Sequence, residues 1–397
     1  MSPLSPPAGA SARDTGGSVQ VAFKVFAMAL GLRLVSSLVG FLSNVTFPPF
    51  TDQHFTVFRQ PNAFWDTFAR YDAGWYYGIA AHGYDYVEGG RNNLAFFPLY
   101  PLLMRWGGRL LGGQQQHFYI AGIMISWLAF AAGLYLLYLL ARVHLCHGAA
   151  LRAVVYSAIF PSAYFFGRVY SESVFFVALV GMTLALQRRR WAIAALVGAA
   201  MTATRVNGIT FIPALAWVAW TAAGSETRPR IKALAAVGGA TAGFALYCAY
   251  SYTISGDPFA WYFSILRWGY QPGGNPLNGL WAVWQALLRH PYEFLANGAM
   301  APYDAFNACI ATAALCAVPF VWRRFGGGYA AVIVLGLALP LSSGQSEGLG
   351  RYSSVLFPLP LLLGSLKGEA RHMVLMTGSA MLYSLGLALF VNVHPLF

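Results

Sequence analysis

The chain has few charged residues and very few acidic ones. Only 10% of its 397 residues are charged and 13 are Asp or Glu, whereas 58% are hydrophobic. A soluble protein of this length would need a far more polar surface, so the composition excludes an ordinary soluble domain. Repeated apolar runs of membrane-spanning length instead predict an all-α polytopic membrane protein.

Motifs for metals and nucleotides are also absent. The four cysteines have no CxxC spacing, so neither a zinc site nor a disulfide framework is indicated. The histidines form neither HExxH nor another paired motif, and there is no Walker loop or Rossmann glycine pattern. The net charge of +12 is scattered over short loops between apolar runs, so a nucleic-acid surface is not indicated.

Apolar runs occur along most of the chain. The candidate spans are 21–43, 94–111, 118–141, 152–167, 171–187, 191–204, 208–223, 232–254, 304–322, 329–343, 352–366 and 372–393. The segment 94–111 contains two prolines and two arginines, so we place it in the membrane interface. The basic loops then fall on the cytoplasmic side, and about 11 transmembrane helices result.

This topology divides the chain into a tail and one transmembrane domain. Residues 1–20, rich in Pro, Ser and Gly, are expected to form a disordered cytoplasmic tail, and 21–397 a single catalytic domain. The long loops 44–117 and 255–303 lie on the outer face, where most of the acidic residues also fall. The pattern predicts a polar cavity that opens outward beneath these loops.

The first long loop carries the strongest chemical signal. Asp66, Asp72, Asp85 and Glu88 are four of the 13 acidic residues and follow the first span closely. Asp72 lies among aromatic residues on a predicted short interfacial helix, where loss of solvation suits a general base. Asp66 is the alternative base. Interface anchoring would also explain the aromatic residues.

A few charged residues near the ends of apolar segments are further candidates. Arg168 and Glu172 have i, i+4 spacing and could simply pair with each other. Arg205 and Arg351 lie at segment ends, where they could hold a phosphate or extend to the lipid headgroups. Arg205 and Asn207 interrupt an apolar run, which suggests a broken helix that lines the cavity.

Five motifs in order resemble those of the PIG-V family of membrane mannosyltransferases. They are RYDAGWYYGIAAHGY, AFFPLYPLLMR, FPSAYFFGRVYSESVFF, TRVNGI and GRYSSVLFPLP, within residues 21–366. The resemblance implies a GT-C glycosyltransferase fold and a polyprenyl-phosphate sugar donor, with no metal or other cofactor. The family's tryptophan–aspartate pair falls on Tyr71 and Asp72, so the aromatic residue differs. An alternative register uses Trp65 and Asp66.

The resemblance also implies an inverting transfer, in which Asp72 takes a proton from the acceptor. The leaving phosphate needs charge stabilisation, for which Arg205 and Arg351 are the candidates. The expected substrate-binding residues are Trp75, Tyr76, His82, Tyr84, Arg168, Glu172, Arg205, Asn207, Arg351 and Tyr352. Aromatic residues of the second long loop offer further contacts: Trp261, Tyr262, Trp268, Tyr270 and Trp281.

The cellular setting and the partners are less closely defined. Short loops rich in Ala, Gly and Arg favour a bacterial inner membrane with an outward-facing site and a lipid-linked or cell-envelope acceptor. A protein partner subunit is left open. A secondary transporter or a lipid-linked sugar flippase is the alternative function, although the sequence shows no repeated halves.

Overall fold

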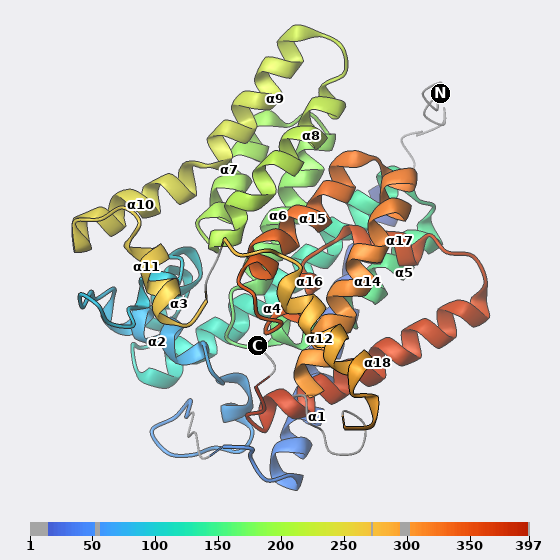
Figure 1. Ribbon diagram of the computed structural model, residues 1–397. Coiled ribbons are helices and arrows are strands. Elements are labelled where there is room, and N and C mark those ends of the chain that lie inside the picture. The colour runs from blue at the N-terminus through green and yellow to red at the C-terminus, as the bar shows by residue number, and fades with distance from the viewer. Residues whose placement is uncertain (1–14, 52–55, 271–272, 294–301, 396–397) are drawn as a thin grey trace.

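The structure is a computed structural model that describes residues 15–51, 56–270, 273–293 and 302–395 (Figure 1). Throughout these ranges the regular elements are helices, and no strand occurs in them. In chain order they are α1 (Thr15–Thr46), η1 (Trp65–Phe68), α2 (Ala73–His82), η2 (Asn93–Ala95), α3 (Leu99–Leu110), α4 (Gln115–His144), α5 (His147–Ala158), η3 (Ala163–Gly167), α6 (Glu172–Gln187), α7 (Trp191–Thr202), η4 (Val206–Phe211), α8 (Ile212–Ala223), α9 (Thr227–Ala240), α10 (Ala242–Ser255), α11 (Ala260–Arg267), α12 (Asn278–Arg289), α14 (Pro302–Phe325), α15 (Gly327–Ser342), α16 (Leu349–Ser354), α17 (Pro358–Gly364) and α18 (Glu369–Val391).

Six stretches in the described ranges are long and apolar enough to cross a membrane. They are Val19–Thr46, Gln115–His144, Val206–Ala223, Thr227–Ser255, Tyr303–Phe325 and Glu369–Val391. Three shorter apolar helices accompany them: Glu172–Gln187, Trp191–Thr202 and Gly327–Ser342. Helices pair their backbone groups within one segment, which a bilayer requires. The prediction of an all-α polytopic membrane protein is confirmed, whereas the total of about 11 spans stays a prediction.

The helix α3 fits the interfacial position expected for 94–111. Its 12 residues extend over only about 18 Å, too short for a hydrocarbon core of about 30 Å. One side is buried through Tyr100 and Met104, while Leu103 and Trp106 are exposed on the other. The helix packs on α2 and α4, next to the loop that carries Asp72.

A break between α7 and α8 follows the predicted interruption. The helix α7 ends at Thr202, the 3-10 turn η4 begins at Val206, and Arg205 lies between them in extended conformation. Close packing of α7 against α10 depends on Gly243, because a Cβ there would lie 1.9 Å from the carbonyl oxygen of Ala199. Thr204 and Asn207 on either side of Arg205 are buried, so the irregular backbone occurs inside the protein, where a membrane protein can accommodate it.

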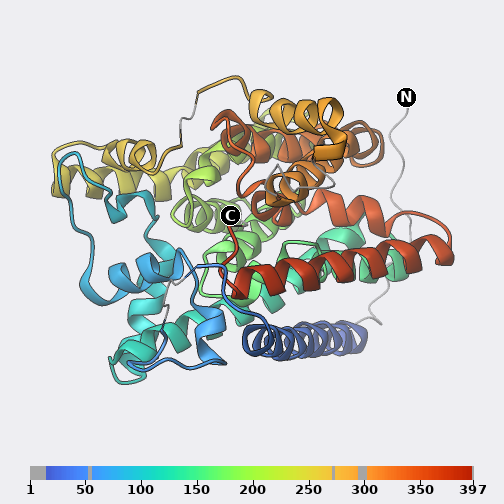
Figure 2. The same cartoon turned by 60° about the horizontal axis from the view of Figure 1, so that its bottom comes forward.

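The helices α1 and α18 lie side by side although they come from opposite ends of the chain (Figure 2). A hydrogen bond of 2.7 Å joins Ser36 of α1 and Tyr383 of α18. The helix α1 begins at Thr15, so residues 15–20 are helical where a disordered tail was expected. Residues 1–14 of that tail lie outside the described residues.

Segments predicted to share one face of the membrane come together in the structure. At one end, residues from the loop 44–117, the α7–α8 break, α11 and the loop before α16 surround a single cavity. At the other end, His144 of α4 contacts Tyr329 of α15, and Arg189 donates to the carbonyl of Ala222. The predicted outer loops thus meet around one cavity, whereas the side of the membrane on which this cavity opens stays a prediction.

Candidate active site

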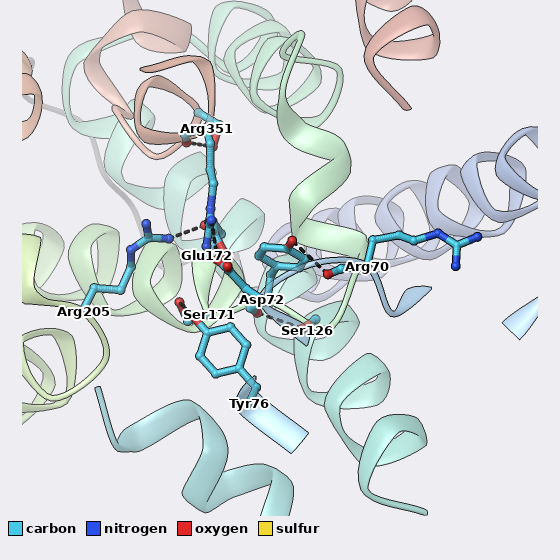
Figure 3. Close-up of polar contacts among 10 residues, drawn as sticks. Arg70, Asp72, Tyr76, Ser126, Ser171, Glu172, Arg205 and Arg351 are labelled. Carbon is cyan, nitrogen blue, oxygen red and sulfur yellow. Dashed lines mark hydrogen bonds and ion pairs between the residues drawn. The ribbon is translucent and has the colours of Figure 1, made fainter. Parts of the chain in front are cut away.

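A buried carboxylate organises the centre of the molecule. Glu172, the first residue of α6, is fully buried, and its Oε1 accepts hydrogen bonds from Nη1 of Arg205 and Nε of Arg351 (Figure 3). The two arginines come from the α7–α8 break and from α16. One carboxylate thus fixes two guanidinium groups that are far apart in the sequence.

The local pair of Arg168 and Glu172 that their spacing allowed does not form. The i, i+4 geometry requires both residues in one helix, but α6 begins at Glu172 and Arg168 precedes it in extended conformation. The Arg168 guanidinium lies over the ring of Phe68 at 4.8 Å, and the side chain is buried away from the cavity. Its expected role in substrate binding has no geometric support.

Asp72 lies beside the arginine pair. It is the N-cap residue of α2, and its Oδ2 accepts a hydrogen bond of 2.6 Å from Nη1 of Arg351 (Figure 3). The side chain does not cap the helix, so Oδ1 is left to accept a proton. One turn further, Tyr76 shares this side of α2, and its hydroxyl lies 2.9 Å from Oγ of Ser171. The short helix predicted around Asp72 is present, with Asp72 at its N-terminal end.

Aromatic rings hold the two guanidinium groups from the side. Arg351 lies 4.6 Å from the ring centroid of Tyr170 and 5.3 Å from that of Phe165, and Arg205 lies 5.0 Å from that of Tyr352. Such contacts stabilise a cation without using its N–H groups. Each guanidinium therefore retains N–H donors beyond those that Glu172 and Asp72 accept.

These groups line a cavity of about 410 Å³. Its polar and charged wall includes Asp72, Arg205, Asn207, Glu347 and Arg351. Its aromatic wall is formed by Tyr76, Phe96, Phe97, Trp261, Tyr262, Trp268, Tyr270 and Tyr352. Of the second-loop aromatic residues singled out in the sequence, only Trp281 is absent from this wall, because it is exposed on α12. The volume suits a small polar ligand with an apolar extension.

The charges around the inner end of the cavity balance. Glu172 and Asp72 supply two negative charges, and Arg205 and Arg351 supply two positive charges within the same hydrogen-bonded group. Because the charges balance, the empty cavity buries no excess positive charge. An anion that enters can then bind the remaining guanidinium N–H donors. Phosphate oxygens are well suited to such donors.

Asp66, the alternative base, has a structural role. Its Oδ1 accepts a hydrogen bond from the backbone N–H of Val57 and its Oδ2 one from that of Asn62, both at 2.8 Å. The side chain is buried and does not line the cavity. Both carboxylate oxygens are thus used to hold the loop between α1 and η1.

Three other candidates lie outside the cavity wall. His82 is exposed at the end of α2, next to the ring of Tyr77. The Tyr84 hydroxyl donates to the carbonyl of Phe96 at 2.6 Å. Trp75 stacks on Phe96 and meets Trp268 edge-on, so it supports two residues of the aromatic wall from behind.

The loop before α16 contributes a cavity residue that the motifs did not single out. Glu347 lines the cavity, four positions before Arg351. Partial burial, and to a lesser extent the nearby Asp304 carboxylate, raise the pKa of Glu347. Asp304 accepts a hydrogen bond from Ser346, and Asn307 accepts one from the backbone N–H of Gly350 at 2.8 Å, so α14 holds this loop. These contacts join segments more than 40 positions apart, so spacing along the sequence could not have indicated them.

Comparison with known proteins identifies relatives. Residues 32–227 match the family described as mannosyltransferase (PIG-V). The fold is similar to that of ArnT from Cupriavidus metallidurans, solved bound to undecaprenyl phosphate, with a TM-score of 0.50 and 12% identity over 93% of this chain and 77% of that one. The oligosaccharyltransferase AglB from Archaeoglobus fulgidus, solved with an inhibitory peptide and a dolichol-phosphate, gives a TM-score of 0.42 and 12% identity over 93% and 56%. No curated protein sequence matches significantly.

The fold and the family match together define a membrane glycosyltransferase of the GT-C class. Neither comparison supports the transporter or flippase alternative. The match over residues 32–227 is to the PIG-V family of mannosyltransferases, the family that the motifs in this region resemble. The motif that contains Arg351 lies beyond the matched region.

Proposed function

We propose that the protein transfers a sugar, mannose by family, from a polyprenyl-phosphate carrier to a lipid-linked or cell-envelope acceptor on the non-cytoplasmic face of a bacterial inner membrane. The proposal rests above all on Asp72, which lies in one cavity with two arginines and is bonded to one of them. A base beside two phosphate-binding cations is the minimum that this reaction needs.

The proposed step is a single inverting displacement. The acceptor hydroxyl oxygen forms a bond to the anomeric carbon of the sugar while its proton passes to Oδ1 of Asp72. The bond between the anomeric carbon and the phosphate oxygen breaks, and its electron pair stays on that oxygen. The products are the glycosylated acceptor, polyprenyl phosphate and a protonated Asp72, which later releases its proton.

The charges favour this division of roles. The phosphate gains a negative charge as it leaves, and at the same time Asp72 loses one by accepting the proton. Arg205 and Arg351 are held in place by Glu172 before substrate binds, so they need little rearrangement to stabilise the leaving phosphate. We therefore propose a reaction that needs no metal ion.

The lipid carrier is supported by the cavity and by the relative. The ArnT protein with the same fold binds undecaprenyl phosphate. Next to the arginines, the cavity has an aromatic wall from α11 and the loop that follows it, which would accommodate the sugar and the first prenyl units. The acceptor is proposed only as a hydroxyl compound anchored in or near the membrane.

The decisive experiment is transfer of radiolabelled mannose from polyprenyl-phosphate mannose to a lipid extract by the purified protein. Wild type, Asp72→Asn and Asp66→Asn are compared at equal amounts of folded protein. Asp72→Asn should lose transfer by at least ~100-fold, because an amide cannot act as the base. Asp66→Asn should keep its kcat and lower the unfolding temperature, since one loop N–H loses its acceptor.

Other outcomes would contradict specific parts of the proposal. Loss of transfer only in Asp66→Asn would move the base to the other register. Transfer by Asp72→Asn at the wild-type rate would remove Asp72 from the chemistry. Absence of transfer by a folded wild type would show that the donor is wrong, and parallel reactions with other polyprenyl-phosphate sugars would then identify the correct one.

A further inference from the structure

The segment 391–394, at the end of α18, holds the residues that precede Asp72. The carbonyl of Val391 accepts a hydrogen bond of 2.9 Å from Nε of Arg70, and the carbonyl of His394 accepts one of 2.6 Å from the Tyr71 hydroxyl. The ring of Tyr71 also packs against Phe390 of α18, at 5.7 Å between centroids. Arg70 and Tyr71, the two residues before Asp72, are thus attached to the same distant segment.

Tyr71 needs such support because of its backbone conformation. Its φ of 52° lies in the left-handed region, which is unfavourable for a residue other than glycine. Strained conformations of this kind persist only where the surroundings hold them. Since Tyr71 directly precedes Asp72, its backbone sets the direction from which the Asp72 side chain reaches Arg351.

The ring of His394 connects this support to α14. A hydrogen bond of 2.6 Å joins its Nδ1 and the hydroxyl of Tyr303, the second residue of α14, and Phe50 packs against the ring at 4.8 Å. The same end of α14 holds the loop before Arg351 through Asp304 and Asn307. One helix end therefore supports both partners of the Asp72–Arg351 pair.

We propose that Tyr71, His394 and Tyr303 form a positioning relay for Asp72. None of the three lines the cavity, so they act through Asp72 and not on the substrate. The proposal rests on the proposed role of Asp72 as the base. Without the relay, the loop leaves its strained conformation and the Asp72 carboxylate moves away from the acceptor hydroxyl.

The test compares single hydroxyl deletions at matched sites. Tyr71→Phe and Tyr303→Phe each remove one hydroxyl of the relay. Tyr383→Phe is the control, because it removes a tyrosine hydroxyl with a bond of similar length, 2.7 Å to Ser36, away from the cavity. For each variant we would measure kcat, the KM for the polyprenyl-phosphate sugar and the unfolding temperature.

Each relay variant should lower kcat about tenfold and leave the donor KM within about twofold, because a small displacement of a base slows the chemical step while the arginines still bind phosphate. The double variant should lose no more than about the larger single loss, since both hydroxyls act through His394. His394→Ala should behave like Tyr303→Phe. His394→Asn, whose amide can replace the hydrogen bond of Nδ1, should recover most of kcat.

Normal kcat in both Tyr→Phe variants, or an equal loss in Tyr383→Phe at the same folded fraction, would overturn the relay. So would fully additive losses in the double variant. If these variants are active while Asp72→Asn is inactive, the relay fails and the proposed function stands. Full activity of Asp72→Asn would instead remove the base and the relay together.

Discussion

Nη1 of Arg351 donates a 2.6 Å hydrogen bond to Oδ2 of Asp72 across 279 positions of sequence. The Nε of the same guanidinium donates to Glu172, which also accepts from Arg205. Arg351 is therefore the only group in the described ranges that bonds to both the proposed base and the buried carboxylate. Its planar shape, with donors on adjacent edges, allows this double role.

Replacement of Arg351 by lysine tests that role. An ammonium group keeps the charge but cannot present the same fixed fork to two carboxylates. Each lost charge-assisted bond costs about 1.5–3 kcal/mol, so kcat/KM for the donor should fall about 10- to 100-fold or more in Arg351→Lys. In Arg205→Lys the ammonium group can re-form the one hydrogen bond to Glu172, so kcat/KM should fall less. Steady-state kinetics with the polyprenyl-phosphate sugar give both values.

Arg152→Lys provides the control, because Arg152 contacts the carbonyl of Gly364 at the opposite end of the molecule. It should leave kcat/KM within about twofold, as is usual for a replacement away from the site. Equal effects of Arg351→Lys and Arg152→Lys would contradict a special function of the fork.

Glu172→Gln should destabilise the protein strongly. The carboxylate is fully buried and neutralises two arginines, and breaking a buried ion pair by removing one partner costs about 3–5 kcal/mol. The unfolding temperature in detergent should fall, while Glu226→Gln, at an exposed position, should leave it unchanged. The unfolding temperature of Glu172→Asp should lie between those of Glu172→Gln and Glu226→Gln. An unchanged unfolding temperature in Glu172→Gln would show that the arginines do not depend on this charge.

The sequence predicted much of the fold, because membrane helices leave a strong local signal. Apolar runs identified α1, α4, α14 and α18. The positive-inside rule predicted that the long loops share one face, and in the structure these loops line one cavity. Where a run was broken, as at Arg205, local composition also indicated the interruption. Helix boundaries were less accurate at α1, which begins at Thr15 within the expected tail.

The site was predicted in part only. Asp72, Arg205 and Arg351 could be singled out, because charges in an acid-poor apolar chain are conspicuous. Their partners could not, because Glu172 is 33 positions from Arg205 and 179 from Arg351. Spacing rules describe neighbours on one helix, and the Arg168–Glu172 pair that they allowed does not form. The contacts of Tyr71 with His394 are equally remote from any local pattern.

Removal of divalent metal ions should leave transfer intact. The described part of the chain contains no group of three or more His, Cys, Asp or Glu residues suited to a metal ion. Asp72 and Glu172 are instead bonded to arginines, which can stabilise the phosphate charge. The rate after dialysis against EDTA should equal the rate with added Mg²⁺ or Mn²⁺. A loss with EDTA that Mg²⁺ restores would contradict the proposed arginine-based stabilisation.

The stability of the protein should depend on pH through Glu347. Partial burial and the neighbouring Asp304 raise its pKa in the folded state, so the folded protein binds the proton more tightly than the unfolded chain. Between the unfolded pKa, ordinarily about 4.3, and the raised folded pKa, stability therefore falls as pH rises. Glu347→Gln removes this titration. Its unfolding temperature should exceed that of wild type at pH 8, and the difference should shrink as pH falls through that window.

Glu88→Gln is the matched control, since Glu88 is an exposed carboxylate of the first long loop and does not line the cavity. Its unfolding temperature should follow that of wild type at every pH. Because Glu347 is partly exposed, solvent screens its repulsion with Asp304, and added salt should reduce the gain in Glu347→Gln at pH 8. If the unfolding temperature of Glu347→Gln exceeds that of wild type by an amount that depends on neither pH nor salt, packing and not charge distinguishes Gln from Glu at this position.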